Sequence, residues 1–286
     1  MKTTRRNFIK TTGVAVGAAT LITQMPFGLS GCAAPKPKEF GFQVWTIKDE
    51  LIADFPGTLK KMAGLGYKQV EMCSPLGYTS SGFGPLNEMS GTEMKKIIDD
   101  SGLTCISSHY GMGELRESLE NRIEWATQLG MKQMVASSFW LPEGASIDEY
   151  RNASDELNLI GEKTKAAGIQ MVFHNHHMEF EKRGDDLIYD ALLAQFDPEL
   201  VKMQFQVAVV NIGYNAADYF RKYPGRFQSA HLADYSTELQ KQVPIGQGIV
   251  DWSDFFEAAK IGGVQNFFVE MDPETFKPSA EYLLKT

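Results

Sequence analysis

The feature that most constrains the fold is an alternation of short apolar runs with longer amphipathic segments along residues 40–286. The apolar runs have the length of buried strands, and the segments between them have helical spacing and often end at a glycine. We expect strands at 42–46, 67–72, 103–108 and 133–137, a fifth that opens at Ile169, and others at 201–207, 227–231 and 266–270. Eight strand–helix units in about 245 residues predict a single-domain α/β protein, a (β/α)8 TIM barrel.

The segments between these strands predict the helices of the same barrel. We expect them at 57–65, 92–101, 115–129, 147–167, 186–195, 216–223, 251–260 and 279–284. A doubly wound sheet is the alternative architecture. Its dinucleotide-binding fingerprint is absent, because the pairs Gly111/Gly113 and Gly246/Gly248 do not follow the first strand and have no third glycine.

One stretch, residues 169–180, opens as an apolar strand and ends in a polar cluster. It holds three of the five histidines of the chain. Strand side chains alternate, so His174 and His176 are expected to share one face while Asn175 and His177 share the other. A single histidine here would be explained by capping of the strand. Three histidines beside Asn175 and Glu179 favour a metal or proton-transfer site.

The carboxyl ends of the expected strands converge on one site in a barrel. Residues at or just past those ends are Glu71, His109, His174, His176, Gln206, His231 and Glu270. Imidazoles and carboxylates together bind Zn, Mn, Fe or Co, and they also serve as acid and base beside a carbonyl. Aromatic residues near the strand ends either stack on sugar rings or pack in the core; they are Trp45, Phe139, Trp140 and Trp252.

The first residues have the pattern of a leader rather than of the fold. The segment around Arg5 and Arg6 resembles the twin-arginine export motif, and residues 29–32 resemble a lipobox that ends at Cys32. The apolar segment between them is too short to span a membrane as a helix. We therefore expect a signal peptide at 1–31, a tether at 32–39 and the barrel at 40–286. The mature protein is then exported, as a periplasmic or membrane-anchored lipoprotein held only through Cys32.

The net charge bears on the class of partner, and the cysteines bear on whether the chain has a disulfide. The net charge of −8 argues against a nucleic-acid partner. Besides Cys32, the chain has Cys73 and Cys105, both in expected strands. They fit inert core thiols, and a disulfide between them is left open.

Five segments together resemble the sugar phosphate isomerase/epimerase family of xylose isomerase-like barrels over residues 40–284. These segments are 173–180, 222–227, 231–234, 246–252 and 269–272. The resemblance implies a divalent metal (Mn, Zn, Co or Mg) bound at strand ends five to eight by His174, Gln206, His231 and Glu270. Many relatives have Glu at the position of His174, and most have Asp at the position of Gln206. Both departures reduce the negative charge of the site.

The departures also shift the acid–base roles, because epimerases of this type use a glutamate on strand five and this chain has none there. His174 or His176 acts as the base, with Glu270 as its partner or as a metal ligand. Substrate contacts are expected from Glu71, His109, Glu179, Arg226, Asp234 and Trp45. The alternative role is orientation of an imidazole for Glu179, and positioning of the loop after the seventh strand for Arg226 and Asp234. We expect an isomerase or epimerase that transfers a proton next to the carbonyl of an unphosphorylated sugar. The alternatives are a β-eliminating lyase or hydratase acting on 3-oxo-glycosides, and a non-catalytic sugar-binding lipoprotein.

Overall fold

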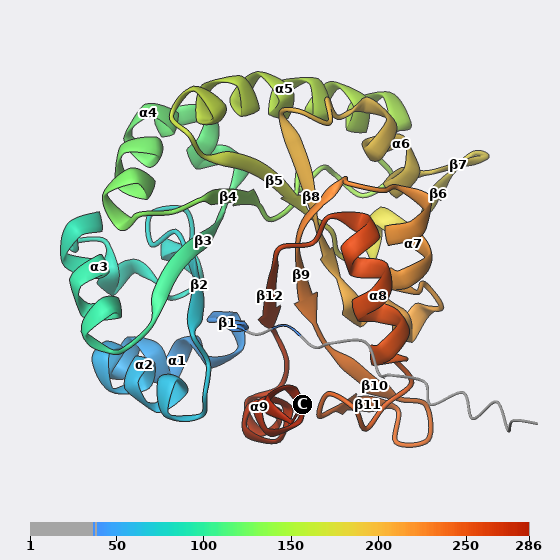
Figure 1. The fold of residues 1–286 in the computed structure, drawn as a ribbon. Helices are drawn as coiled ribbons and strands as arrows, with labels where there is room; N and C mark the ends of the chain where they lie inside the picture. The colour runs from blue at the N-terminus through green and yellow to red at the C-terminus, as the bar shows by residue number, and fades with distance from the viewer. Residues whose placement is uncertain (1–36, 38, 286) are drawn as a thin grey trace, which may run out of the picture. The chain divides into compact units, whose positions relative to one another are not determined.

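The computed structural model describes residue 37 and residues 39–285, in which eight parallel strands close into a barrel surrounded by helices (Figure 1). Around the barrel the order is β1-β12-β9-β8-β5-β4-β3-β2. The strands are β1 (Gly41–Gln43), β2 (Gln69–Cys73), β3 (Thr104–Tyr110), β4 (Gln133–Ala136), β5 (Gln170–His174), β8 (Val201–Gln206), β9 (Phe227–Leu232) and β12 (Asn266–Val269). The expected (β/α)8 TIM barrel is confirmed.

The helices follow the strands along the chain, and most lie close to the expected ranges. They are α1 (Lys48–Ala53), α2 (Phe55–Gly64), α3 (Gly91–Asp100), α4 (Met112–Leu129), α5 (Ile147–Ala166), α6 (Ile188–Gln195), α7 (Ala216–Lys222), α8 (Trp252–Gly262) and α9 (Phe276–Leu284). Capping boxes set two of the starts. Ser90 caps α3 with Glu93, and Ser146 caps α5 with Glu149. Such caps stabilise a helix by about 1 kcal/mol each.

Three local features differ from the sequence-based expectation. The first strand is shorter than 42–46, because residues Trp45–Ile47 turn into a 3-10 helix that leads to α1. Two hairpins were not expected, β6 (Lys182–Arg183) with β7 (Asp186–Leu187), and β10 (Asp234–Ser236) with β11 (Lys241–Val243). Strands of two or three residues are too short to show a period-two pattern.

The outer face of the barrel packs against the helices through aromatic and aliphatic side chains. Phe205, on β8, lies 5.7 Å from Phe220 of α7 between ring centroids, and Phe220 lies 5.5 Å from Phe255 of α8. The hydroxyl of Tyr67 donates to the carbonyl of Phe276 at 2.9 Å, which fastens α9 to the barrel. This apolar layer stabilises the fold and leaves the inner face free to carry other chemistry.

The inner face of the barrel carries polar residues where bulky aliphatic side chains are usual. Gln133 donates to Ser107 Oγ at 2.7 Å and to Ser229 Oγ at 3.0 Å. Gln204 donates to Ser229 Oγ at 3.0 Å and to Glu71 Oε1 at 2.8 Å. All five side chains are fully buried. Buried polar groups are tolerated when they are hydrogen-bonded, and this network supplies the partners.

The predictions about the leader concern residues outside the described ones, Arg5, Arg6 and Cys32 among them. Within residues 37 and 39–285, no helix has both the length and the apolar character needed to cross a membrane. Cys73 and Cys105 are both buried free thiols, so the alternative of a disulfide between them is not realised.

Candidate functional site

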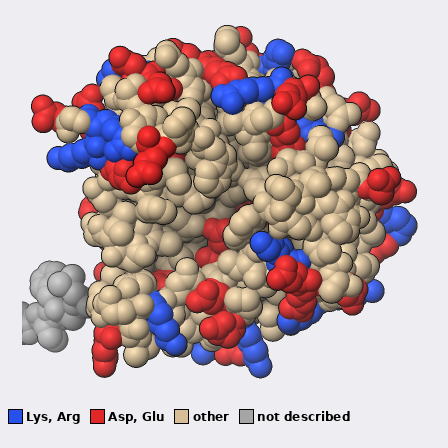
Figure 2. All heavy atoms as spheres, turned by 180° about the vertical axis from the view of Figure 1, so that it is seen from behind, with Lys and Arg blue, Asp and Glu red and all other residues tan. Residues whose placement is uncertain are grey.

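A cavity of about 760 Å³ lies at the carboxyl ends of the barrel strands. Of the predicted site residues, it is lined by Trp45, His109, His174, His176, Gln206 and Glu270. On the face shown in Figure 2, a central hollow is lined mainly by uncharged residues, with acidic atoms in its depth. A concave site with a few convergent polar groups is the usual form of a small-molecule site.

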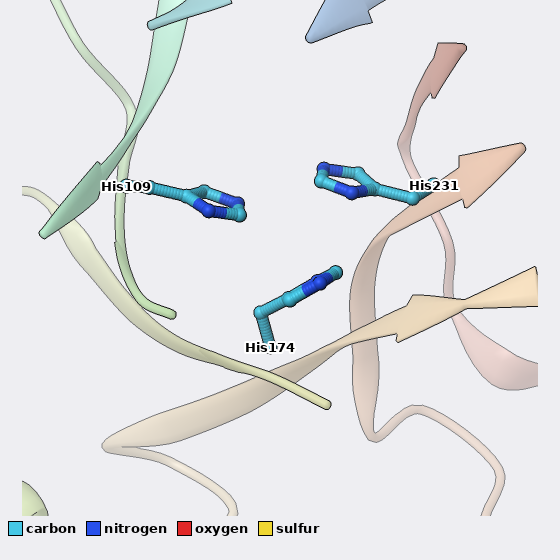
Figure 3. A group of neighbouring side chains, drawn as sticks. All are labelled: His109, His174 and His231. Atoms are coloured by element: carbon cyan, nitrogen blue, oxygen red, sulfur yellow. The ribbon is translucent and has the colours of Figure 1, made fainter. Parts of the chain in front are cut away.

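Three histidines from three strands point toward one another (Figure 3), and two of them, His109 and His174, line the cavity. His109 comes from β3, His174 from β5 and His231 from β9, and each can offer a ring nitrogen within 4.8 Å of the others. The rings of His109 and His231 are stacked with centroids 5.2 Å apart, and that of His174 lies 4.5 Å from that of His231. Parallel register sets this geometry, because His231 is level with Gln206 and His174 with Gln204.

His231 lies between two carboxylates. Its Nε2 hydrogen-bonds to Glu71, and its Nδ1 lies 2.9 Å from Oε2 of Glu270. Burial alone would lower the pKa of His231, but Glu71 and then Glu270 raise it to about 10. Burial likewise opposes ionisation of Glu71, yet His231 and His109 hold its pKa well below the usual range. The three groups therefore form a buried ionised cluster at neutral pH.

His174 and His176 have the opposite electrostatic character. Burial, followed by the neighbouring histidines, lowers the pKa of His174 well below its usual value. Burial lowers the pKa of His176 to about 4. Among the described residues, Nδ1 of each ring is buried and has no hydrogen-bond partner. Both neutral imidazoles line the cavity beside the ionised cluster, and a neutral imidazole can accept a proton.

The donor set fits a divalent ion in part. A divalent ion would replace the proton that the imidazolium of His231 carries on Nδ1, and Glu71 would still hold Nε2, as a carboxylate orients a metal-binding histidine. His174 adds the unpartnered Nδ1. Gln206 fits less well, because its Nε2 amide, rather than its oxygen, faces Glu270 at 2.6 Å. The described histidines offer a second set, His109 with His174 and His231.

Two of the predicted substrate contacts, Glu179 and Asp234, have structural partners of their own. Glu179 is buried and accepts the backbone N–H of His176 at 2.7 Å, so it fixes the histidine loop, and burial raises its pKa to about 7. Asp234 accepts the backbone N–H groups of Gly246, Gly248 and Val250 and the indole N–H of Trp252. It therefore holds the loop after β9, one of the two roles expected for it.

Arg226 and Glu71 lie away from the cavity surface. Arg226 precedes β9 at its amino end, and its guanidinium donates to the carbonyls of Leu193 at 2.8 Å and Phe196 at 3.2 Å. The structure therefore gives it a bracing position rather than a place in the cavity. Glu71 has no exposed surface and contacts His231 and His109 from below, so it acts on the site through those rings.

The sequence analysis did not identify the polar residues in the middle of the barrel. Gln204 lies at its centre, where its Oε1 is 2.8 Å from Nε2 of His109. Ser107, Gln133 and Ser229 complete the layer. A signal was present, because Gln204, Ser107 and Ser229 each lie two residues before a predicted site residue and so face the same way.

Comparisons with known proteins agree with this architecture. A family model described as "Xylose isomerase-like TIM barrel" matches residues 59–285. A sugar phosphate isomerase/epimerase from Parabacteroides distasonis superposes with a TM-score of 0.74 at 26% identity, over 88% of this chain and 95% of that one. A D-psicose 3-epimerase, at 15% identity and a TM-score of 0.62, shares the fold over 86% of this chain and 96% of its own.

Curated relatives include inosose dehydratases. That of Geobacillus thermodenitrificans is 27% identical over 237 residues, which are 67% of this chain and 77% of the relative. That of Lacticaseibacillus casei is 26% identical over 160 residues, or 48% of this chain. The match spans about half of the length of the L. casei protein, 52%. These relatives belong to a superfamily that contains isomerases, epimerases and dehydratases.

Proposed function

The chain belongs to the xylose isomerase-like TIM barrel family, and on that premise we propose that it is an enzyme that moves a proton next to the carbonyl of an uncharged sugar or cyclic polyol. The observation that carries this proposal is the pair of neutral imidazoles, His174 and His176, that line the cavity. Proton abstraction beside a carbonyl needs a positioned base and a group that stabilises the enolate.

The enolate needs a source of positive charge beside the carbonyl oxygen. The imidazolium of His231 is offset by the carboxylates of Glu71 and Glu270, so the cluster carries no net positive charge. A divalent ion held by Glu270, His174 and the neutral form of His231 would supply that charge and Lewis acidity at the carbonyl oxygen. Glu179 keeps His176 in place through the backbone, so the base approaches from a fixed direction.

Of the two reactions that a proton transfer next to a carbonyl can lead to here, we favour β-elimination over epimerisation. Epimerisation by two bases needs a second group that can donate a proton to the opposite face of the carbon. Glu270 is the candidate, but it is engaged by His231 and Gln206, and despite burial His231 lowers its pKa. In elimination the base takes the α-proton, the C–H electrons form the enolate, and the β C–O bond breaks. The carbonyl re-forms as the Cα–Cβ double bond forms, and the leaving oxygen takes the proton back from the imidazolium that the base has become. The dehydratase relatives support this choice.

Isomerisation or epimerisation remains the second candidate function. The observation in its favour is the likeness to the sugar phosphate isomerase/epimerase of P. distasonis over most of both chains. The cavity offers few cationic side chains that could bind a phosphate group. The one arginine among the cavity-lining residues, Arg116, is paired with Glu156 at 2.7 Å, and no lysine lines the cavity within the described part of the chain. This supports an unphosphorylated substrate.

The decisive experiment follows candidate substrates by NMR in D2O, with and without added Mn²⁺. The panel contains inosose, a 3-oxo-glycoside and a ketohexose. Loss of water or release of the leaving group supports elimination, whereas deuterium incorporation with the carbon skeleton retained supports isomerisation. Binding without either change would contradict an enzymatic role and favour the sugar-binding protein. The His176→Gln variant is the matched control, because it keeps the cavity but removes the imidazole.

We also propose that the protein is exported and anchored through Cys32, on the strength of the leader motifs alone. Replacement of Arg5 and Arg6 by lysine should leave the precursor in the cytoplasm. Cys32→Ala should move the protein from the membrane to the soluble fraction. Unchanged membrane fractionation of both variants would contradict the proposal.

A further inference from the structure

Trp140 has an unusual backbone conformation and an unusual exposure. Its φ of 51° lies in the left-handed region, which bulky residues rarely adopt. Its indole is 61% exposed, so packing against the protein does not explain why the chain accepts this conformation. Strained residues of this kind gather at ligand-binding positions. The indole lies at the cavity wall, 5.8 Å from the ring of His176 between centroids.

The wall around Trp140 differs from the histidine side of the cavity. It is built by the loops after β1 to β4 and carries the aromatic side chains of Trp45, Tyr78, Phe139 and Trp140. Gly111 and Gly113 also line it, and a Cβ atom added at either would meet no atom within 4 Å. This half of the cavity therefore offers apolar ring faces and open space.

The cavity is also larger than one monosaccharide requires. A hexose has about a dozen non-hydrogen atoms, and even at the ~30 Å³ that each water molecule occupies in the liquid, they would take up about 360 Å³. The cavity measures about 760 Å³. A substrate with a single ring would leave about half of this volume empty.

We propose that the cavity takes a two-ring glycoside whose second ring, linked through the glycosidic oxygen to the reacting polyol ring, stacks on Trp140. This inference rests on the proposed function, because it assumes that the reacting ring lies on His174 and His176. The second ring is either another sugar or an aromatic group. Both present a flat face with apolar hydrogens or π electrons to the indole, which is the shared chemistry that Trp140 recognises.

The test compares binding of one-ring and two-ring probes to the full chain by calorimetry or ligand-observed NMR. The probes are methyl β-D-glucopyranoside, phenyl β-D-glucopyranoside and cellobiose. We expect a two-ring probe to bind about tenfold more tightly than the methyl glycoside. Cellobiose and the phenyl glycoside distinguish a second sugar from an aromatic group. Trp140→Ala should reduce this ratio to near one, and Trp140→Phe should retain most of it.

Equal affinity of one-ring and two-ring probes would overturn the inference, as would a lack of measurable binding by both two-ring probes. A ratio that survives Trp140→Ala would also overturn it, because the second ring would then lie elsewhere. Thermal unfolding of each variant separates loss of the ring from loss of folded protein. These readouts do not involve turnover, so the deuterium experiment can fail or succeed independently of them.

Discussion

The two halves of the barrel mouth are built from different parts of the fold, one from strands and the other from loops. The histidine half uses side chains on the strands or directly after them, namely His174, Gln206, His231 and Glu270, and most of these are held by hydrogen bonds. The aromatic half uses loops, and its outermost member, Trp140, is exposed and strained. Rigid elements suit groups that must meet reacting atoms within a fraction of an ångström, whereas loops suit recognition of variable groups. Mutations in the two halves should therefore have different consequences.

The largest effect on stability is expected below the histidine half. Replacing Glu71 by leucine removes one partner of a buried charged cluster and leaves His231 with a single carboxylate. Breaking a buried pair in this way costs about 3–5 kcal/mol of the free energy of unfolding. Urea denaturation measures it, with Glu117→Leu at an exposed position of α4 as the matched control. A loss below about 1 kcal/mol would show that the cluster is not a structural element.

Turnover should be most sensitive to the strand-five histidines. His176→Gln is expected to lower turnover by about 10²-fold or more, the scale of a general base, because the amide cannot accept the proton. Folded content, checked by thermal unfolding, should stay unchanged. His174→Gln tests the second ring in the same assay. Normal turnover in both variants would exclude His174 and His176 as the base. The histidine half would then have no catalytic role that the aromatic half lacks.

Metal affinity provides a third comparison within the histidine half. Glu71→Gln should weaken binding of a divalent ion by about 10–100-fold, since Glu71 orients His231 without contacting the ion. His231→Ala with Glu270→Ala should abolish occupancy. Elemental analysis after dialysis against Mn²⁺ or Zn²⁺ measures both. Full occupancy in the double variant would move the metal away from these residues.

Stability should depend on pH through His231 in protein stripped of metal. The folded pKa of about 10 lies above the unfolded value of about 6.5, so the contribution is complete below pH 6.5 and is lost as pH rises toward 10. A single group of this kind changes the free energy of unfolding by about 1.4 kcal/mol per pH unit within that window. His231→Asn should show a shallower decline by urea denaturation. Identical slopes would mean that His231 is already neutral at pH 6.5.

The sequence predicted the histidine half better than the aromatic half, for a physical reason. Strand alternation and the convergence of strand ends place His109, His174 and His231 together without any tertiary information, and the structure brings them together. The same alternation, applied two residues earlier, would have found Gln204 and the serines. The ion pairing of His231 depends on which strands are neighbours, and order along the sequence does not fix distances.

The positions of the loops could not be predicted in the same way. A left-handed φ at Trp140 has no signature in the sequence, because glycine or asparagine usually occupies such a position. The β10–β11 hairpin brings Gln242 into the cavity wall, and its strands are too short for a periodic signal. The bracing position of Arg226 follows from carbonyl groups on α6 and just after it, which lie about 30 residues earlier in the chain.

The smallest change in the free energy of unfolding is expected for a substitution at Trp140, and its sign is more informative than its size. Its backbone conformation costs about 1–3 kcal/mol, and little of the indole is packed. Trp140→Gly relieves that strain but adds freedom to the unfolded chain, so the free energy of unfolding should stay the same or rise by about 1 kcal/mol. Its neighbour Phe139 is the control, because that ring is 4% exposed and lies 4.7 Å from Phe173 between centroids. Phe139→Ala should cost about 3–5 kcal/mol. If Trp140→Gly lost as much, Trp140 would be a core residue, and the contrast between a packed loop base and a ligand-facing indole would disappear.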